Sequence, residues 1–111
     1  MKEFILFFRM DITVEYPAEQ MHVYMQQWQS WIDEIASNQQ LAGGNHLLTQ
    51  GRVVDSHQEI KNKPYTESNM SVAGYIIIKA HDLDGATQIA QHCPILAGKG
   101  NTVEVREIAV L

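Results

Sequence analysis

Hydrophobic residues change their spacing along the chain, and the first two patterns predict a strand and a helix. The unbroken apolar run from Phe4 to Phe8 predicts a strand that is buried on both faces. From Pro17 onward apolar residues recur at steps of three and four, which is the spacing of one helical stripe. The Gly43-Gly44 pair predicts where this helix stops. The stripe consists of Met21, Tyr24, Met25, Trp28, Trp31, Ile32 and Ile35.

The rest of the chain predicts three further strands and a second helix. Residues 46–54 predict one strand, and residues 72–79, rich in Ile, predict the clearest strand of the chain. Asp82 can cap a helix that Pro94 ends. The alternation of Val with charged residues over 102–108 predicts a last, half-exposed strand.

These elements follow one another as βαββαβ along a single domain, residues 1–111. Two β-α-β units in this order interlock into a four-stranded antiparallel sheet with both helices on one face, the ferredoxin-like fold of the α+β class. The other sheet face is left bare, and its burial against a second copy predicts a homodimer. The alternative is that the long polar connection, residues 55–71, folds back over that face.

Composition and charge exclude several classes of partner. Eight basic residues are scattered among thirteen acidic ones, for a net charge of -5, which argues against nucleic acid as a ligand. The apolar run near the N-terminus is far too short to span a bilayer, so we expect no membrane contact. Cys93 is the single cysteine, which rules out an intrachain disulfide and suits a reducing cytoplasm.

Several short motifs occur in an order that resembles the DGPF-type branch of the YCII-related family. In that branch an Asp-Gly-Pro-Phe-x-Glu motif precedes a strand with Gly-Tyr, a helix ending in Cys-Pro and a strand with Glu-Val-Arg. The matching segments are Asn62-Lys63-Pro64-Tyr65-Thr66-Glu67, Ala73-Gly74-Tyr75, His92-Cys93-Pro94 and Glu104-Val105-Arg106. Asn62 and Lys63 replace Asp and Gly, so the namesake motif is degraded. The resemblance implies a dimeric α+β barrel built from two facing ferredoxin-like sheets.

The resemblance leaves the activity open. Some relatives look like small-molecule enzymes, whereas others are encoded near alternative sigma factors, which hints at a regulatory role. We therefore expect a small-molecule enzyme or ligand-binding protein, with a non-catalytic regulatory module that acts as a homodimer as the alternative. Cofactor-free oxygenase chemistry is a third alternative that rests on fold analogy alone.

Five residues are candidates for a ligand pocket between the sheet and the long connection. His46, at the start of a predicted strand, is the candidate general acid or base, because imidazole titrates near neutral pH. Arg9 and Arg106 lie near strand ends and can grip a small anionic ligand with bidentate guanidinium groups. Tyr65 and Glu67, which remain from the degraded motif, would line the same pocket.

Ordinary structural roles compete with each of these assignments. His46 can be a half-exposed strand residue with no chemical role. Arg9 can simply pair with Glu104 or Glu67. No two histidines stand four positions apart on a helix and no Cys–His cluster exists, so we expect neither a metal site nor a bound cofactor.

Overall fold

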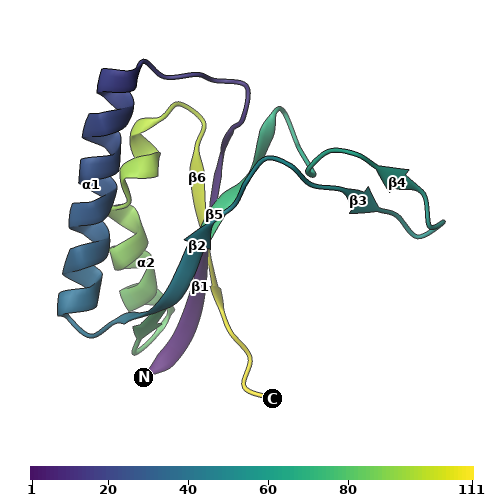
Figure 1. Cartoon of the computed structure of the whole chain (residues 1–111). Coiled ribbons are helices and arrows are strands. Elements are labelled where there is room, and N and C mark those ends of the chain that lie inside the picture. The colour runs from purple at the N-terminus through teal and green to yellow at the C-terminus, as the bar shows by residue number, and fades with distance from the viewer.

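Four strands form one antiparallel sheet, and two helices cover one of its faces (Figure 1). The computed structural model describes residues 1–111. The strands lie in the order β2-β5-β1-β6, which is the order of the ferredoxin-like fold, so the predicted fold class is confirmed. The bounds of these strands are Lys2–Asp11 (β1), Leu41–His46 (β2), Met70–Ala80 (β5) and Thr102–Glu107 (β6).

Strand β1 shows how the sheet separates the core from the open face. Phe4, Leu6 and Phe8 are buried on the helix side, because alternate side chains of a strand point to the same face. Ile5 and Phe7 point the other way and are only half-buried, so the predicted burial of both faces is not reached within one chain. The helices and the short 3-10 helix Pro94–Ala97 complete the core with Trp28, Trp31, Ile35, Ala86, Ala90, Cys93 and Ile95.

Helix α1 spans Ala18–Ser37 and begins directly after Pro17, as predicted. Its predicted end is wrong, because the helix is capped at Asn38 and the glycine pair lies inside β2. A local pattern cannot distinguish a glycine that ends a helix from one that lets two strands approach each other closely. No helix of the structure combines the length and the hydropathy needed to cross a membrane.

The second strand lies earlier in the chain than predicted. The prediction placed a strand at residues 46–54, but β2 ends at His46. Within the rest of the predicted range, only Val53–Val54 forms a strand, which is β3. The physical reason is that β2 is held by antiparallel pairing with β5, across a bulge between Leu41 and Gly43. Pairing between residues this far apart in sequence leaves no trace in the local pattern.

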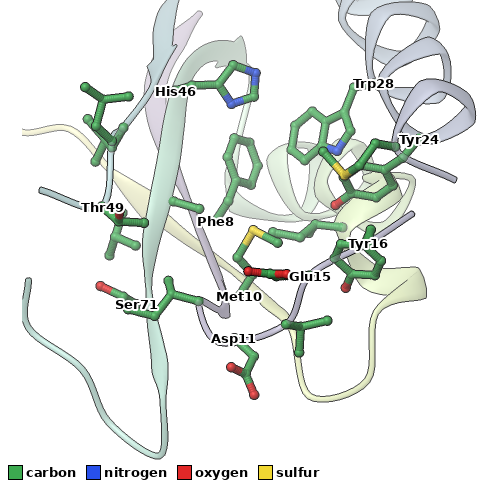
Figure 2. Close-up of a pocket in the computed structure, with 18 of the residues that line it drawn as sticks. Phe8, Met10, Asp11, Glu15, Tyr16, Tyr24, Trp28, His46, Thr49 and Ser71 are labelled. Atoms are coloured by element: carbon green, nitrogen blue, oxygen red, sulfur yellow. The ribbon is translucent and has the colours of Figure 1, made fainter. Parts of the chain in front are cut away.

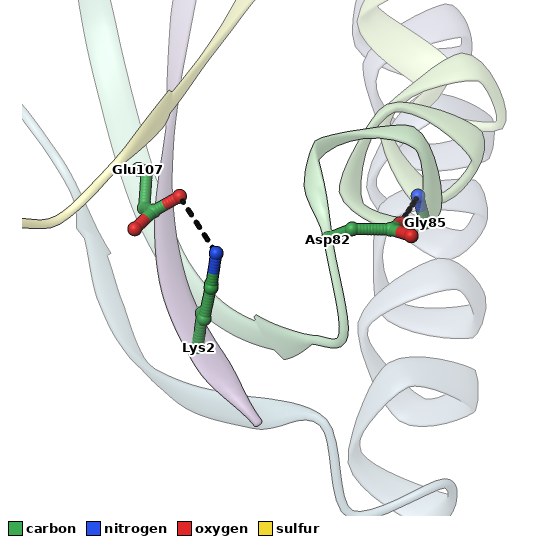
Figure 3. A network of polar contacts seen from close by, with 4 residues as sticks. All are labelled: Lys2, Asp82, Gly85 and Glu107. Atoms are coloured by element: carbon green, nitrogen blue, oxygen red, sulfur yellow. Dashed lines mark hydrogen bonds and ion pairs between the residues drawn. The ribbon is translucent and has the colours of Figure 1, made fainter.

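Helix α2, Leu83–Gln91, has the predicted N-cap. The Asp82 Oδ1 atom accepts the backbone N–H of Gly85 at 2.8 Å, which satisfies one of the free donors of the first turn (Figure 3). Figure 3 also shows an ion pair between Lys2 Nζ and Glu107 Oε1 at 3.7 Å. Both side chains of this pair are exposed to water, so the link between β1 and β6 contributes little to stability.

The segment between β2 and β5 forms an arm, defined here as residues 47–66, that projects from the sheet on the side opposite the helices (Figure 1). The arm contains a small antiparallel hairpin of β3 and β4, the latter spanning Ile60–Lys61. It therefore does not fold back over the open sheet face, which was the alternative to a homodimer. The apolar side chains on the open face, such as Ile5 and Phe7, are therefore not covered by the arm within one chain.

Candidate functional site

A hollow of about 650 Å³ lies between the first turns of α1, the ends of β1, β2 and β5, and the base of the arm (Figure 2). This volume falls within the range of about 300–1,000 Å³ that small-molecule sites occupy. Fourteen of the twenty lining residues are hydrophobic, so the walls of the hollow favour an apolar molecular surface.

Aromatic rings form the helix side of this hollow (Figure 2). The rings of Phe8 and Trp28 meet edge to face with their centroids 4.8 Å apart, and the Tyr24 ring lies 6.1 Å from Trp28. Tyr16, from the loop before α1, stacks on Tyr24 at 6.4 Å. Burial raises the pKa of the Tyr24 phenol above its ordinary value of 10.0, and the protonated hydroxyl can donate a hydrogen bond to a ligand.

His46 lies at one edge of the hollow, where β2 ends (Figure 2). Its ring centroid is 6.1 Å from that of Trp28, and its partner across the sheet is Gly74 of β5. The imidazole is exposed and also borders a smaller hollow of about 330 Å³ between α1 and β2. A ligand in either hollow can therefore exchange a hydrogen bond or a proton with His46.

The part of the hollow away from His46 carries carboxylates and no cations (Figure 2). Asp11 and Glu15 line this part, and neither Lys nor Arg lines the hollow anywhere. Asp11 Oδ1 accepts the hydroxyl of Thr13 at 2.5 Å and its backbone N–H at 2.8 Å, and these bonds hold the pKa of Asp11 below its ordinary value. No three His, Cys, Asp or Glu side chains lie close enough together to hold a metal ion.

The predicted site residue Arg9 lies on the open sheet face, away from the aromatic hollow. Its Nη1 atom donates to Glu104 Oε1 at 2.6 Å, which is one of the ordinary roles considered for it. The guanidinium carbon also lies 5.8 Å from the ring centroid of Phe7 on the same face. Arg9 is thus occupied by neighbours of its own chain.

The other three predicted residues, Tyr65, Glu67 and Arg106, also lie outside the aromatic hollow. Tyr65 and Glu67 line a shallow depression of about 780 Å³ at the base of the arm, which Arg9 also borders. Arg106 is exposed on β6 and lines none of the three hollows described. The structure therefore brings Arg9, Tyr65 and Glu67 together around a depression that does not include His46, although it shares Leu47, Leu48 and Pro64 with the aromatic hollow.

Most of the aromatic hollow escaped the sequence reasoning. An apolar helical stripe of aromatic and Met residues ordinarily packs into the core, and Trp28 is indeed buried. Tyr24 is only half-buried, however, and Met25 is exposed at the mouth of the hollow. The available signal was Tyr16 just before the helix, because one more large side chain beside Met21 and Tyr24 at this end exceeds what the core can cover.

Cys93 is protected from chemistry by its burial. Only 3% of the residue is exposed, and burial raises the pKa of its thiol from 9.0 to about 12. Because the pKa is raised in the fold, the neutral thiol stabilises the protein below pH 9.0, and this contribution is lost as the pH rises toward about 12. We expect a thiol reagent to modify the native protein far more slowly than the protein unfolded in urea. Equal rates in the two states would contradict this burial.

Known proteins resemble this chain in family and in fold. The family model described as YCII-related domain matches residues 14–110. A solved structure with a similar fold is 5-chloro-2-hydroxyhydroquinone dehydrochlorinase (TftG) from Burkholderia phenoliruptrix AC1100, in complex with 2,5-dihydroxybenzoquinone. Its TM-score is 0.56 at 13% sequence identity, and the alignment covers 96% of this chain and 93% of that chain. No protein of curated function matches the sequence.

Proposed function

Because this chain belongs to the YCII-related domain family, we propose that it binds a small molecule with an aromatic or apolar body in the hollow beside His46. The same match confirms the family resemblance found in the motifs. The observation that carries the proposal is the hollow itself, about 650 Å³ of space walled by aromatic rings. The dehydrochlorinase of similar fold holds 2,5-dihydroxybenzoquinone, and a single ring of this kind is small enough for the hollow.

The charge of the hollow favours a neutral ligand over the anion expected from the sequence. An anion would meet the carboxylates of Asp11 and Glu15 with no cation to offset them. To reach Arg9 it would have to displace Glu104. Tyr65 and Glu67 would then serve only a ligand in the separate depression at the base of the arm.

His46 is the residue we propose for acid–base chemistry if the bound molecule is also converted. It is the one histidine that lines the hollow, and the neighbouring Trp28 ring keeps one side of its imidazole apolar. A hydroxyl or carbonyl group of a ligand would form a hydrogen bond with the imidazole on its other side. The reaction would be a proton transfer at that group, for which imidazole is suited at neutral pH.

A thermal-shift screen of neutral, anionic and cationic single-ring compounds tests this function. A ligand at a hundred times its Kd adds about 2.7 kcal/mol to the free energy of unfolding, which raises the melting temperature clearly. We expect neutral aromatic compounds to give the largest shifts, with His46→Ala reducing them and His81→Ala, at an exposed turn, leaving them unchanged. If no ring compound binds, the small-molecule reading fails and the regulatory module gains support. Mass analysis of each hit after incubation then separates binding from catalysis.

We further propose that the open sheet face is buried in a homodimer. Ile5 and Phe7 of β1 and Tyr75 and Ile77 of β5 lie side by side on this face, because the register pairs Ile5 with Ile77 and Phe7 with Tyr75. All four are half-buried within one chain, no helix covers them (Figure 1), and the Arg9 guanidinium lies beside the Phe7 ring. An apolar patch of this kind is costly to leave in water, and a second copy of the same patch can cover it, with the charged Arg9, Glu104 and Arg106 at its β6 side.

Analytical ultracentrifugation tests the dimer directly. We expect the wild-type protein to sediment as a dimer, and Ile77→Lys to sediment as a folded monomer, because the substitution places a charge at the centre of the apolar interface. Gln88→Lys adds the same charge on the exposed side of α2 and should leave the dimer intact. A wild-type monomer at every concentration would show that the open face has no second copy against it.

A further inference from the structure

The arm is an organised structure that adds nothing to its own core. Its hairpin pairs Val54 with Ile60, and the Oδ1 atom of Asp55 closes the turn by accepting the backbone N–H groups of His57 at 2.8 Å and Glu59 at 3.0 Å. No residue of the arm belongs to the buried core cluster. A two-stranded hairpin is at best marginally stable alone in water, so this one needs a surface to pack against.

The arm exposes the apolar side chains that such packing would bury. Leu48 is 84% exposed, Tyr65 72%, Ile60 63% and Val54 58%. Val54 and Ile60 are directly opposite each other in the hairpin, so they form one continuous apolar patch. Single exposed apolar residues are common on protein surfaces, but a paired patch on a projecting hairpin is typical of an interaction surface.

The direction and length of the arm identify the partner. The arm leaves the sheet on the side of the open face (Figure 1), which is the side where the proposed homodimer places the second copy. From His46 to the turn at His57 the extended chain can reach roughly 36 Å. Two sheets that pack face to face lie only about 10 Å apart. The arm therefore spans the gap between the sheets and has length left to lie along the second copy.

The charge of the arm is also complementary to the charge of the rest of the chain. The arm carries three basic residues and two acidic ones, which gives it a net charge of +1. Because the whole chain has a net charge of -5, the residues outside the arm carry a net charge of -6. Neither α1 nor α2 contains Lys or Arg. The basic residues of the arm, Arg52, Lys61 and Lys63, would thus approach an acidic body.

We propose that the arm of each chain embraces a second copy of this chain, with the patch of Val54 and Ile60 buried against it. This inference rests on the proposed homodimer and adds a second contact to it, separate from the open face. The base of the arm also lines the aromatic hollow, through Leu47, Leu48 and Pro64. Docking of the arm thereby ties the shape of the ligand site to the assembled dimer.

Two arm variants test the embrace in the full-length protein by the concentration dependence of sedimentation. The double variant Val54→Ser with Ile60→Ser removes the apolar patch, and we expect the dimer Kd to rise about tenfold or more. The matched control His57→Ser changes an exposed residue of the same arm and leaves its backbone bonds intact, so its Kd should equal that of the wild type. Raising the salt concentration should weaken the wild-type dimer, because the charge pairing is exposed to solvent.

A second variant with a shortened arm controls for the case in which the double variant fails to fold its hairpin. Arg52 Nε donates to Asn62 Oδ1 at 3.1 Å, so these two residues are adjacent and a short Asn-Gly turn can replace the segment between them. This variant should also dimerise at least tenfold more weakly, with an unchanged circular dichroism spectrum in the far ultraviolet. If both arm variants dimerise as tightly as the wild type while Ile77→Lys does not dimerise, the embrace is wrong and the open-face dimer stands. A wild-type monomer overturns both proposals.

Discussion

The Gly44→Ala variant is expected to lose about 3 kcal/mol or more of its free energy of unfolding, since backbone strain of about 1–3 kcal/mol adds to a steric clash. Gly44 has a φ of +148°, where side chains are strained. An added Cβ atom would lie 2.5 Å from the Tyr75 carbonyl oxygen and 2.8 Å from the Ile76 Cα atom. Both contacts are with the backbone of β5, so relief requires β2 to separate from its only neighbour in the sheet.

The adjacent glycine provides the matched control. A Cβ atom added at Gly43 meets nothing within 4 Å, so Gly43→Ala should change the free energy of unfolding by less than about 0.5 kcal/mol. Urea unfolding followed by tryptophan fluorescence measures both variants, because Trp28 and Trp31 report on the core. Equal losses at Gly43 and Gly44 would contradict the described register of β2 against β5.

The Phe4→Ala variant is expected to lose about 3–5 kcal/mol of its free energy of unfolding. Phe4 is 0% exposed and lies among the largest fully buried side chains, together with Leu6, Ile78 and Ile95. Its removal leaves a cavity on the helix side of the central strand β1, where both neighbouring strands limit relaxation. For a domain of this size such a loss is a large share of the total stability.

The neighbouring residue on the opposite face separates core packing from strand propensity. Ile5→Ala removes a β-branched side chain from the same strand, but Ile5 is half-buried, so the loss of monomer stability should be well below that of Phe4→Ala. The comparison is made by urea unfolding at protein concentrations low enough for the monomer to predominate, which removes any dimer contribution and keeps the Ile5–Ile77 pair intact. A larger loss for Ile5 than for Phe4 would mean that the helices cover the other face of the sheet.

The fold could be predicted from the sequence because its main elements have strong local signals. The helical stripe through Trp28 and Trp31, the apolar run of β1 and the Asp82 cap each agree with the structure. The βαββαβ order then leaves few topologies, since connections are short and crossovers right-handed. The bounds of β2 could not be predicted, because its low-propensity residues Gly43 and Gly44 become a strand only through pairing with β5.

The candidate site could be predicted only in part. His46 was found as a histidine near a strand end, and the structure places it beside an aromatic hollow. The sequence could not show whether His46, Arg9 and Arg106 lie in one pocket. The sheet face to which each of these side chains points depends on the register between strands. A bulge between Phe8 and Arg9 shifts the register of β1 against β5 at this end of the sheet.

By itself the sequence determined the fold class, the family, the two helices and the strand β1, because hydrophobic periodicity and capping act over a few neighbouring residues. The tertiary structure alone decided the edge strand β2, the ion pair that occupies Arg9, the hollow beneath Tyr24 and the direction of the arm. Each of these depends on contacts between segments far apart in the chain. Such contacts are selected by register, twist and available volume, which no local pattern of hydrophobic and polar residues encodes.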